Sequence, residues 1–327
     1  GEPDHGAFSV WYGWTAPETT QVRAQVCNAA TPKRLGVFQG DDTMGSGGHW
    51  NVFTRQDVGE DGDCDFTFAA VAGETYWLAV TSFSANVGEF ELSLRELDPP
   101  AYDEFANALA VSPALPQEIP ATNVDAMSKP FEQGDYNGVW FSWTAPSSAP
   151  VKVDACGSAL GIEIAVYLDP PPGESLPPPY GAIRAAGGNS CAVAFNPEPG
   201  ETYKIQASTF TPAEGAFIFR MRPASPPAND AFAARQDLGS GDAVSAIGTT
   251  VDATTEWPQE AARGKTVWYQ WTAPRNTAAW VDACGESRHE VTVYTGASLG
   301  SLDDVAWGTC NSSATPSFGA LAGTTYV

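Results

Sequence analysis

The chain has 327 residues, of which 43% are hydrophobic and 11% aromatic, a composition typical of folded rather than disordered protein. It carries 39 acidic and 16 basic side chains, and the net charge of −23 would repel nucleic acids and anionic membrane surfaces. No apolar run approaches the roughly 20 residues of a membrane-spanning helix. We therefore expect two or three domains and exclude nucleic-acid binding and membrane insertion.

A tripled motif divides the chain into repeats. The string Trp-[Tyr/Phe]-x-Trp-Thr-Ala-Pro begins at Trp11, Trp140 and Trp268, at intervals of 129 and 128 residues. This spacing indicates a repeated domain rather than a short solenoid unit. Proline pairs at 99–100 and 226–227 are typical of stiff linkers. We predict repeats over 1–98, 101–225 and 228–327.

Each tripled motif begins a strand with a period of two. In the first repeat Val10, Tyr12 and Trp14 share one apolar face, which we expect to meet the core. The chain has many short alternating runs of this kind, 32 Gly, 26 Pro and no amphipathic helix. These features predict an all-β chain of tandem antiparallel β-sandwich domains. The segment 105–110 is the best candidate for a short helix. The corresponding apolar faces of the later repeats are Val139, Phe141, Trp143 and Val267, Tyr269, Trp271.

Six cysteines occur two per repeat at corresponding positions. This arrangement favours one disulfide in each repeat and an oxidising compartment. Zinc is the competing interpretation, but the sequence has no C-x-x-C pair and its three histidines are scattered. The predicted pairs are Cys27 with Cys64, Cys156 with Cys191, and Cys284 with Cys310.

Further motifs follow a fixed order in the last repeat. Asn229, Asp230, Phe232 and Ala233 precede the tryptophan motif, and the segments 293–296 and 322–326 follow it. In this combination the chain resembles the bacterial pre-peptidase C-terminal (PPC) domain family over nearly its whole length. The resemblance implies a jelly-roll-like sandwich that is exported with secreted hydrolases or strung along large surface proteins, with calcium in some relatives. The first repeat lacks the opening motif, and the second reads Tyr-Asp where Asn-Asp is usual.

Sequence motifs for catalysis are weak. The segment 296–300 matches G-x-S-x-G and His289 is nearby, but that motif needs a strand-to-helix turn on a parallel sheet. The corresponding loops of the other repeats lack the serine. His5, His49 and His289 share no position in the repeat, so no triad or histidine metal site recurs. We expect no enzymatic activity.

An acidic loop surrounds Cys64 in the first repeat. Carboxylate oxygens are the ligands that calcium prefers. Asp61, Asp63 and Asp65 are therefore candidate calcium ligands, and a solvated acidic loop is the alternative.

The first tryptophan of each tripled motif lies on the polar face of its strand. An exposed tryptophan is a platform for a sugar ring or a partner side chain. Trp11, Trp140 and Trp268 are therefore possible contact aromatics. The alternative is structural: a loop, the opening segment or the next repeat covers each of them.

Two functions remain open. The first is a structural or adhesive part of a bacterial cell-surface, fibre or appendage protein, whose partners are neighbouring repeats or other copies. The second is an accessory region that brings a secreted hydrolase to polysaccharide or protein. Compared with the second repeat, the first lacks about 29 opening residues and the third lacks 18 closing residues. We expect either a longer repeat protein or copies that complete one another's sheets.

Overall fold

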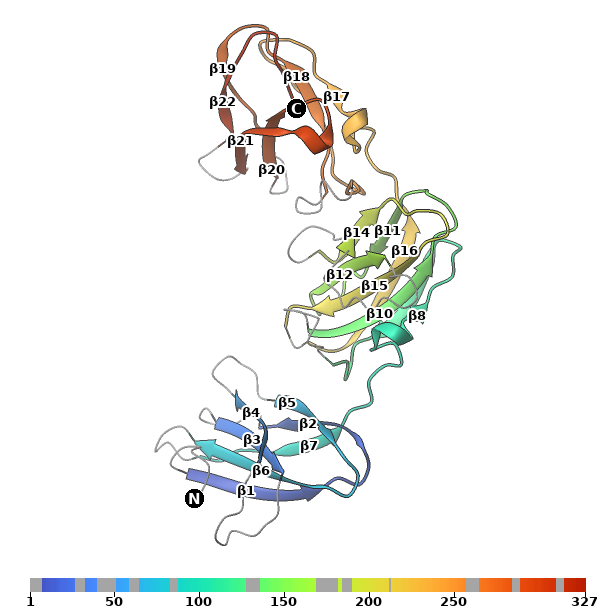
Figure 1. Cartoon of the computed structure of the whole chain (residues 1–327), viewed down its shortest axis with the longest axis vertical. Coiled ribbons are helices and arrows are strands. Elements are labelled where there is room, and N and C mark those ends of the chain that lie inside the picture. The colour runs from blue at the N-terminus through green and yellow to red at the C-terminus, as the bar shows by residue number, and fades with distance from the viewer. Residues whose placement is uncertain are drawn as a thin grey trace. The chain divides into compact units, whose positions relative to one another are not determined.

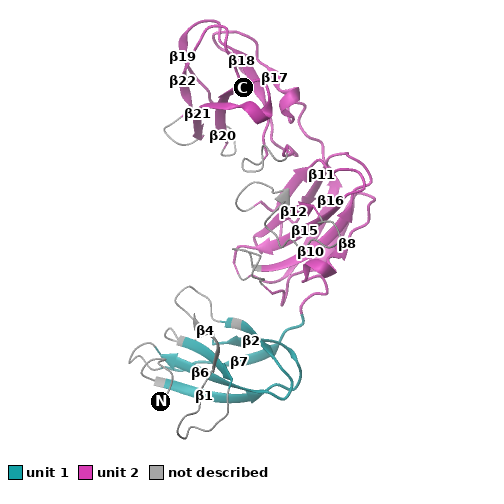
Figure 2. Cartoon of the chain, in the orientation of Figure 1, with its two compact units in different colours: residues 1–98 teal, residues 99–327 magenta. Residues whose placement is uncertain are grey.

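A computed structural model describes residues 8–26, 33–39, 51–58, 65–82, 88–127, 136–168, 182–183, 190–211, 213–256, 265–283, 289–309 and 315–327 (Figure 1). The chain divides into two compact units, Gly1–Asp98 and Pro99–Val327 (Figure 2).

The first unit is a two-sheet sandwich in which every described strand pair is antiparallel. One sheet has the order β1-β6-β3-β4 and the other has the order β5-β2-β7. Buried apolar residues, among them Val22, Leu35 and Leu78, form its core. The strands are β1 (Phe8–Thr15), β2 (Thr20–Gln25), β3 (Lys33–Gln39), β4 (Asn51–Val58), β5 (Asp65–Ala70), β6 (Thr75–Ser82) and β7 (Ser93–Glu96).

The second unit begins with a larger sandwich. A five-stranded sheet, β13-β12-β15-β10-β8, faces a four-stranded one, β14-β11-β16-β9. Their core includes the stacked rings of Phe141 and Phe219, whose centroids are 3.8 Å apart. Its elements are the 3₁₀ helix η1 (Phe105–Asn107) and strands β8 (Leu109–Ala110), β9 (Gln117–Thr122), β10 (Tyr136–Thr144), β11 (Val151–Asp154), β12 (Ile162–Leu168), β13 (Ala182–Ile183), β14 (Ala192–Phe195), β15 (Thr202–Thr209) and β16 (Ala216–Pro223).

The last part of the second unit consists of small sheets with the orders β17-β18-β23, β19-β22 and β20-β21. Two small apolar clusters, one around Ala273 and Tyr326 and one around Phe232 and Trp268, form its core. The elements are η2 (Phe232–Ala234), β17 (Gln236–Asp237), β18 (Tyr269–Thr272), β19 (Thr277–Trp280), β20 (Glu290–Thr295), η3 (Leu299–Ser301), β21 (Asp303–Thr309), β22 (Ser317–Ala320) and β23 (Thr325–Tyr326).

The structure confirms the all-β antiparallel sandwich fold. It differs in the opening segments, where β8 pairs with β10 and β17 pairs with β18 in parallel. The expected short helix at 105–110 is one turn of 3₁₀ helix followed by β8, because Leu109 and Ala110 join the edge of the sheet. None of the described helices is long and apolar enough to cross a membrane.

In each repeat, residues of the recurring motifs form hydrogen bonds that join the loops at one end of the sandwich. In the second repeat, the Ala145 amide donates to Glu201 and the Gly200 amide donates to the Ala145 carbonyl. The buried hydroxyl of Tyr203 then accepts a hydrogen bond of 2.8 Å from the Glu198 amide. The same bond joins Tyr76 to the Val71 amide and Tyr326 to the Leu321 amide. The recurring alanine, glycine and tyrosine are therefore explained by folding.

The expected core face of the first strand is covered in the second repeat and only partly covered in the first. Val139, Phe141 and Trp143 are at most 1% exposed, whereas Val10 and Tyr12 are 48% and 42% exposed. In the second repeat, Tyr102 of the opening segment packs on Phe141 of β10. Among the described residues of the first unit, only β6 lies beside β1, so the expectation for Val10 and Tyr12 is wrong. The counterparts Val267, Tyr269 and Trp271 are half-buried.

Candidate functional site

The predicted disulfide of the second repeat is present. Cys156, which follows β11, is bonded to Cys191, which precedes β14, and the two are 35 residues apart in sequence. Because β11 and β14 are paired in the sheet, the bond joins adjacent chain segments. The four remaining cysteines, Cys27, Cys64, Cys284 and Cys310, lie outside the described residues.

The candidate calcium ligands are largely outside the described residues. Asp61 and Asp63 are not described. Asp65, at the start of β5, forms an ion pair of 3.2 Å with Arg23 and accepts a hydrogen bond from Gln25. Among the described residues, no group of three or more His, Cys, Asp or Glu side chains is placed to hold a metal ion. The calcium site stays a prediction.

The opening segments cover two of the three candidate contact tryptophans. Trp140 is fully buried, and Phe105 of η1 packs edge-to-face on it with ring centroids 5.0 Å apart. Phe232 of η2 packs on Trp268, which is 7% exposed, at the same distance. These two rings are therefore core residues and present no face to a ligand. Trp11 is half-buried and packs against Phe38.

In the second unit, the aspartate of each opening motif accepts a hydrogen bond from a backbone amide. Asp103 accepts a hydrogen bond of 2.9 Å from the Met127 amide. In the third repeat the buried Asp230 accepts from both the amide and the hydroxyl of Thr254. In each repeat these bonds fix a loop with the sequence Val-Asp-Ala, at 124–126 and 251–253. The motif that carries the family resemblance thus orders this loop.

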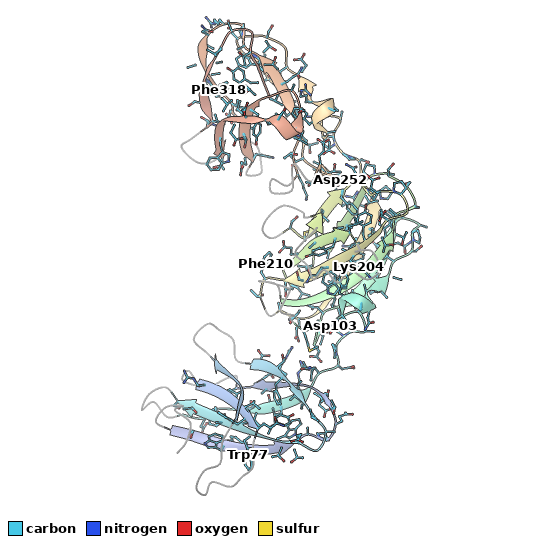
Figure 3. All side chains as sticks on the ribbon, in the orientation of Figure 1. Trp77, Asp103, Lys204, Phe210, Asp252 and Phe318 are labelled. Carbon is cyan, nitrogen blue, oxygen red and sulfur yellow. A yellow bond between two sulfur atoms is a disulfide. The ribbon has the colours of Figure 1, made fainter. Side chains whose placement is uncertain are left out.

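The Val-Asp-Ala loop of the third repeat carries the charged contact that we take as the candidate site (Figure 3). Asp252 is 7% exposed and has a left-handed backbone with φ of 58°. Arg222 on β16 donates two hydrogen bonds to it, of 3.0 and 3.1 Å. Lys152 on β11 donates a third of 3.0 Å. Because Lys152 and Arg222 are cross-strand partners, the second repeat presents a basic pair that the third repeat neutralises.

The surroundings of Asp252 favour its ionised form. Burial raises the pKa of Asp252, but the hydrogen bonds from Arg222 and Lys152 outweigh burial and hold the pKa at about 2. The same carboxylate raises the pKa of Arg222. Partial burial and the charge of Lys152 lower the pKa of Lys265, and Asp252 offsets part of this shift. The contact is therefore ionic over the whole neutral range.

A further hydrogen bond joins the same two repeats. Asn196, which follows β14, donates a hydrogen bond of 2.9 Å to the hydroxyl of Thr254. Sequence reasoning missed Asp252, Lys152 and Arg222. The recurrence of Val-Asp-Ala 127 residues apart was the available signal, but the basic pair lies 30 and 100 residues away in the chain.

Two tryptophans of the third repeat are exposed, and sequence reasoning did not single them out. Trp280 at the end of β19 is 67% exposed, and Trp307 on β21 is 61% exposed. Trp280 stands at the position that Lys152 occupies in the second repeat, four residues before a cysteine. These rings are available to a partner.

The G-x-S-x-G segment lies in an antiparallel setting. It follows β20, which pairs with β21 in antiparallel fashion, and leads into the single turn of η3. The Ser298 hydroxyl lies 2.7 Å from the Ser301 hydroxyl. This geometry is a local turn and lacks the strand-to-helix elbow of a hydrolase nucleophile.

Comparisons with known proteins give no family. No family model matches the chain, and no curated protein matches it. Among solved structures, it is similar to the CUB1-EGF-CUB2 domains of human MASP-1/3, with 10% identity, a TM-score of 0.20 and coverage of 67% of this chain and 94% of that one. An uncharacterized protein from Burkholderia cenocepacia gives 12% identity, a TM-score of 0.24 and coverage of 66% and 76%. The same domains of rat MASP-1 give 9% identity, a TM-score of 0.19 and coverage of 66% and 92%.

Proposed function

We propose that the chain is a non-catalytic array of PPC-like β-sandwich repeats that serves as a structural or adhesive part of a bacterial extracellular or cell-surface protein. The observation that carries the proposal is the contact of Asp252 with Lys152 and Arg222, which joins one repeat to the opening segment of the next. A joint of this kind suits a spacer, because it limits how far consecutive domains can rotate. The disulfide of the second repeat supports an oxidising compartment.

The recurring motifs also support a structural role. Their tyrosine hydroxyls, their glycines and the capping aspartates are engaged in hydrogen bonds within the fold. Calcium in the acidic loop around Asp63 belongs to the same proposal. Removing it with a chelator should lower the melting temperature, since a ligand bound only to the folded state stabilises that state.

A second candidate is an accessory binding region of a secreted hydrolase, and the exposed rings of Trp280 and Trp307 favour it. The two functions are separated by antibody labelling of intact producing cells and by binding assays on insoluble polysaccharide and collagen. A surface protein is labelled by the antibody on intact cells and does not co-purify with a hydrolase. An accessory region co-purifies with a hydrolase and binds the solid substrate, with binding lost in Trp280→Ala.

A further inference from the structure

The strand β21 lies at the edge of its sheet. It pairs with β20 on one side, and no described strand of the third repeat pairs with its other side. The corresponding strands of the earlier repeats, β4 and β13, are also the last strands of their sheets. An edge position is therefore a property of this strand in every repeat, and the edge presents backbone donors and acceptors to a further strand.

β21 lacks most of the features that protect an edge strand. Edge strands are commonly very short or carry lysine or proline, which disfavour pairing with another chain. β13 has two residues, whereas β21 has seven and contains neither lysine nor proline. Its side chains include Val305 and Trp307, which are 36% and 61% exposed. A register shift lies beside Val305, so residues 306–309 form the regular run that a partner strand can follow.

The ring of Trp307 faces away from the core, beside a hydroxyl and a carboxylate. Ala306 packs against the buried cluster that contains Val293, so the next residue, Trp307, points to the opposite face. On β20, Thr292 lies directly opposite Trp307 in the register. Glu290 is two residues before Thr292, so it shares the outward face, and it is exposed. Diagonal neighbours of this kind on one sheet face are within reach of long side chains.

The charge around Trp307 favours a basic partner. The strands β20 and β21 contain no lysine or arginine, and their carboxylates at Glu290 and Asp303 are exposed. An aromatic ring attracts a cation over its face, and this protein already has such a contact, with the Arg235 guanidinium 4.6 Å from the centre of the Phe232 ring. A second copy of the chain is disfavoured, because the net charge of −23 would bring like charges together.

We propose that β21 binds an extended basic segment of a different protein, which pairs with residues 306–309 as an added strand and places an arginine or lysine on the Trp307 ring. Backbone hydrogen bonds to the edge supply affinity, and alternate side chains supply specificity. Since every second residue of a strand points to the same face, the partner needs basic residues at every second position. A neutral sugar could stack on Trp307, but it would use neither the backbone edge nor the charge of Glu290.

This inference goes beyond the proposed function, because it concerns one edge strand and holds whether the array is a spacer or an accessory region. The probe is a short peptide in which arginine and valine alternate, titrated into the full chain by calorimetry. The control peptide has the same composition, with all its arginines before all its valines, so it has the same general attraction to an acidic chain. We expect the alternating peptide to bind about tenfold more tightly, and amide hydrogen exchange over 306–309 to slow about tenfold when it binds.

Four substitutions test where the peptide binds. Trp307→Ala should weaken binding about tenfold and Trp307→Phe less, because phenylalanine keeps an aromatic face. Trp280→Ala removes an equally exposed ring of the same repeat and should leave binding unchanged. Glu290→Gln should weaken binding about threefold, whereas Glu91→Gln, at an exposed glutamate of the first repeat, should not.

Three results would overturn the proposal. They are absence of binding by the alternating peptide, equal binding of the two peptides, and parent-like binding by Trp307→Ala. A neutral oligosaccharide that binds at Trp307 when the peptide does not would also overturn it, in favour of a sugar platform. The melting temperature of each variant shows that it is folded, and the Trp307→Phe variant decides the outcome if Trp307→Ala is not.

Discussion

Arg222 forms a bidentate ion pair with Asp252 of the following repeat. Its Nη1 donates a hydrogen bond of 3.0 Å to Oδ2, and its Nη2 donates one of 3.1 Å to Oδ1. The planar guanidinium matches the two carboxylate oxygens, which makes such pairs stronger and more directional than a single contact. Asp252 is kept in a left-handed turn and Asp230 caps the residues that follow it. Residues of both the second and the third repeat therefore hold the loop around Asp252 in place at the junction between these repeats.

Asp252→Asn should loosen this junction. The variant keeps the shape and the turn preference of the side chain but removes the charge that Lys152 and Arg222 neutralise. We expect the opening free energy of segment 249–255 to fall by about 2 kcal/mol, which amide hydrogen exchange measures. Asp242→Asn, which breaks the exposed ion pair with Arg275, is the control and should change little. Equal effects of the two substitutions would contradict the role assigned to Asp252.

The junction should depend on pH only in strong acid. The pKa of Asp252 is about 2 in the folded chain, below its usual value of 3.8, so its ionised form contributes stability above pH 3.8. That contribution is lost as the pH falls through about 2. The stability difference between the parent chain and Asp252→Asn should be constant from pH 7 to 5 and shrink toward pH 2. A difference that persists at pH 2 would point to packing rather than charge.

Tyr203→Phe should cost about 1 to 2 kcal/mol of unfolding free energy, because the Glu198 amide loses its acceptor, the buried hydroxyl of Tyr203. Burial raises the pKa of Tyr203 above 10.0, so its neutral form stabilises the fold below pH 10. That stability is lost as the pH rises through the folded pKa, and the phenylalanine variant lacks this alkaline loss. Tyr12→Phe, at a 42% exposed tyrosine, is the matched control in urea unfolding.

Trp140→Ala should greatly lower the free energy of unfolding, whereas Trp280→Ala should leave it nearly unchanged. Trp140 is fully buried against Phe105 and Tyr167, so its truncation should cost about 3 to 5 kcal/mol. Trp280 is 67% exposed, and its truncation should change stability by less than about 0.5 kcal/mol. Chemical denaturation of both variants tests this. A large loss of stability in Trp280→Ala would mean that its ring is covered.

Peptide mapping without reduction should recover Cys156 bonded to Cys191, as the structure has it. The repeat predicts two further pairs, Cys27 with Cys64 and Cys284 with Cys310. Reduction of the bond that closes 35 residues should destabilise the second repeat by about 4 kcal/mol in the chain-entropy estimate. A link between cysteines of different repeats would contradict the predicted domain boundaries.

The sequence by itself determined the sandwich fold, the matching positions of the repeats and the pairing of Cys156 with Cys191. These features are visible because strand alternation is local and because a domain-length period places corresponding residues together. The motif tyrosines could be aligned in the same way, although their hydrogen bonds to Val71, Glu198 and Leu321 could not be read from the sequence.

Only the tertiary structure decided which faces are covered. Trp140 and Trp268 lie on the polar face by sequence parity, yet Phe105 and Phe232, which lie more than 30 residues earlier, bury them. The partners of Asp252 come from two strands that the sheet register brings side by side. Alternation along one strand assigns its two faces but says nothing of what packs on either, since that depends on contacts between segments far apart in the chain.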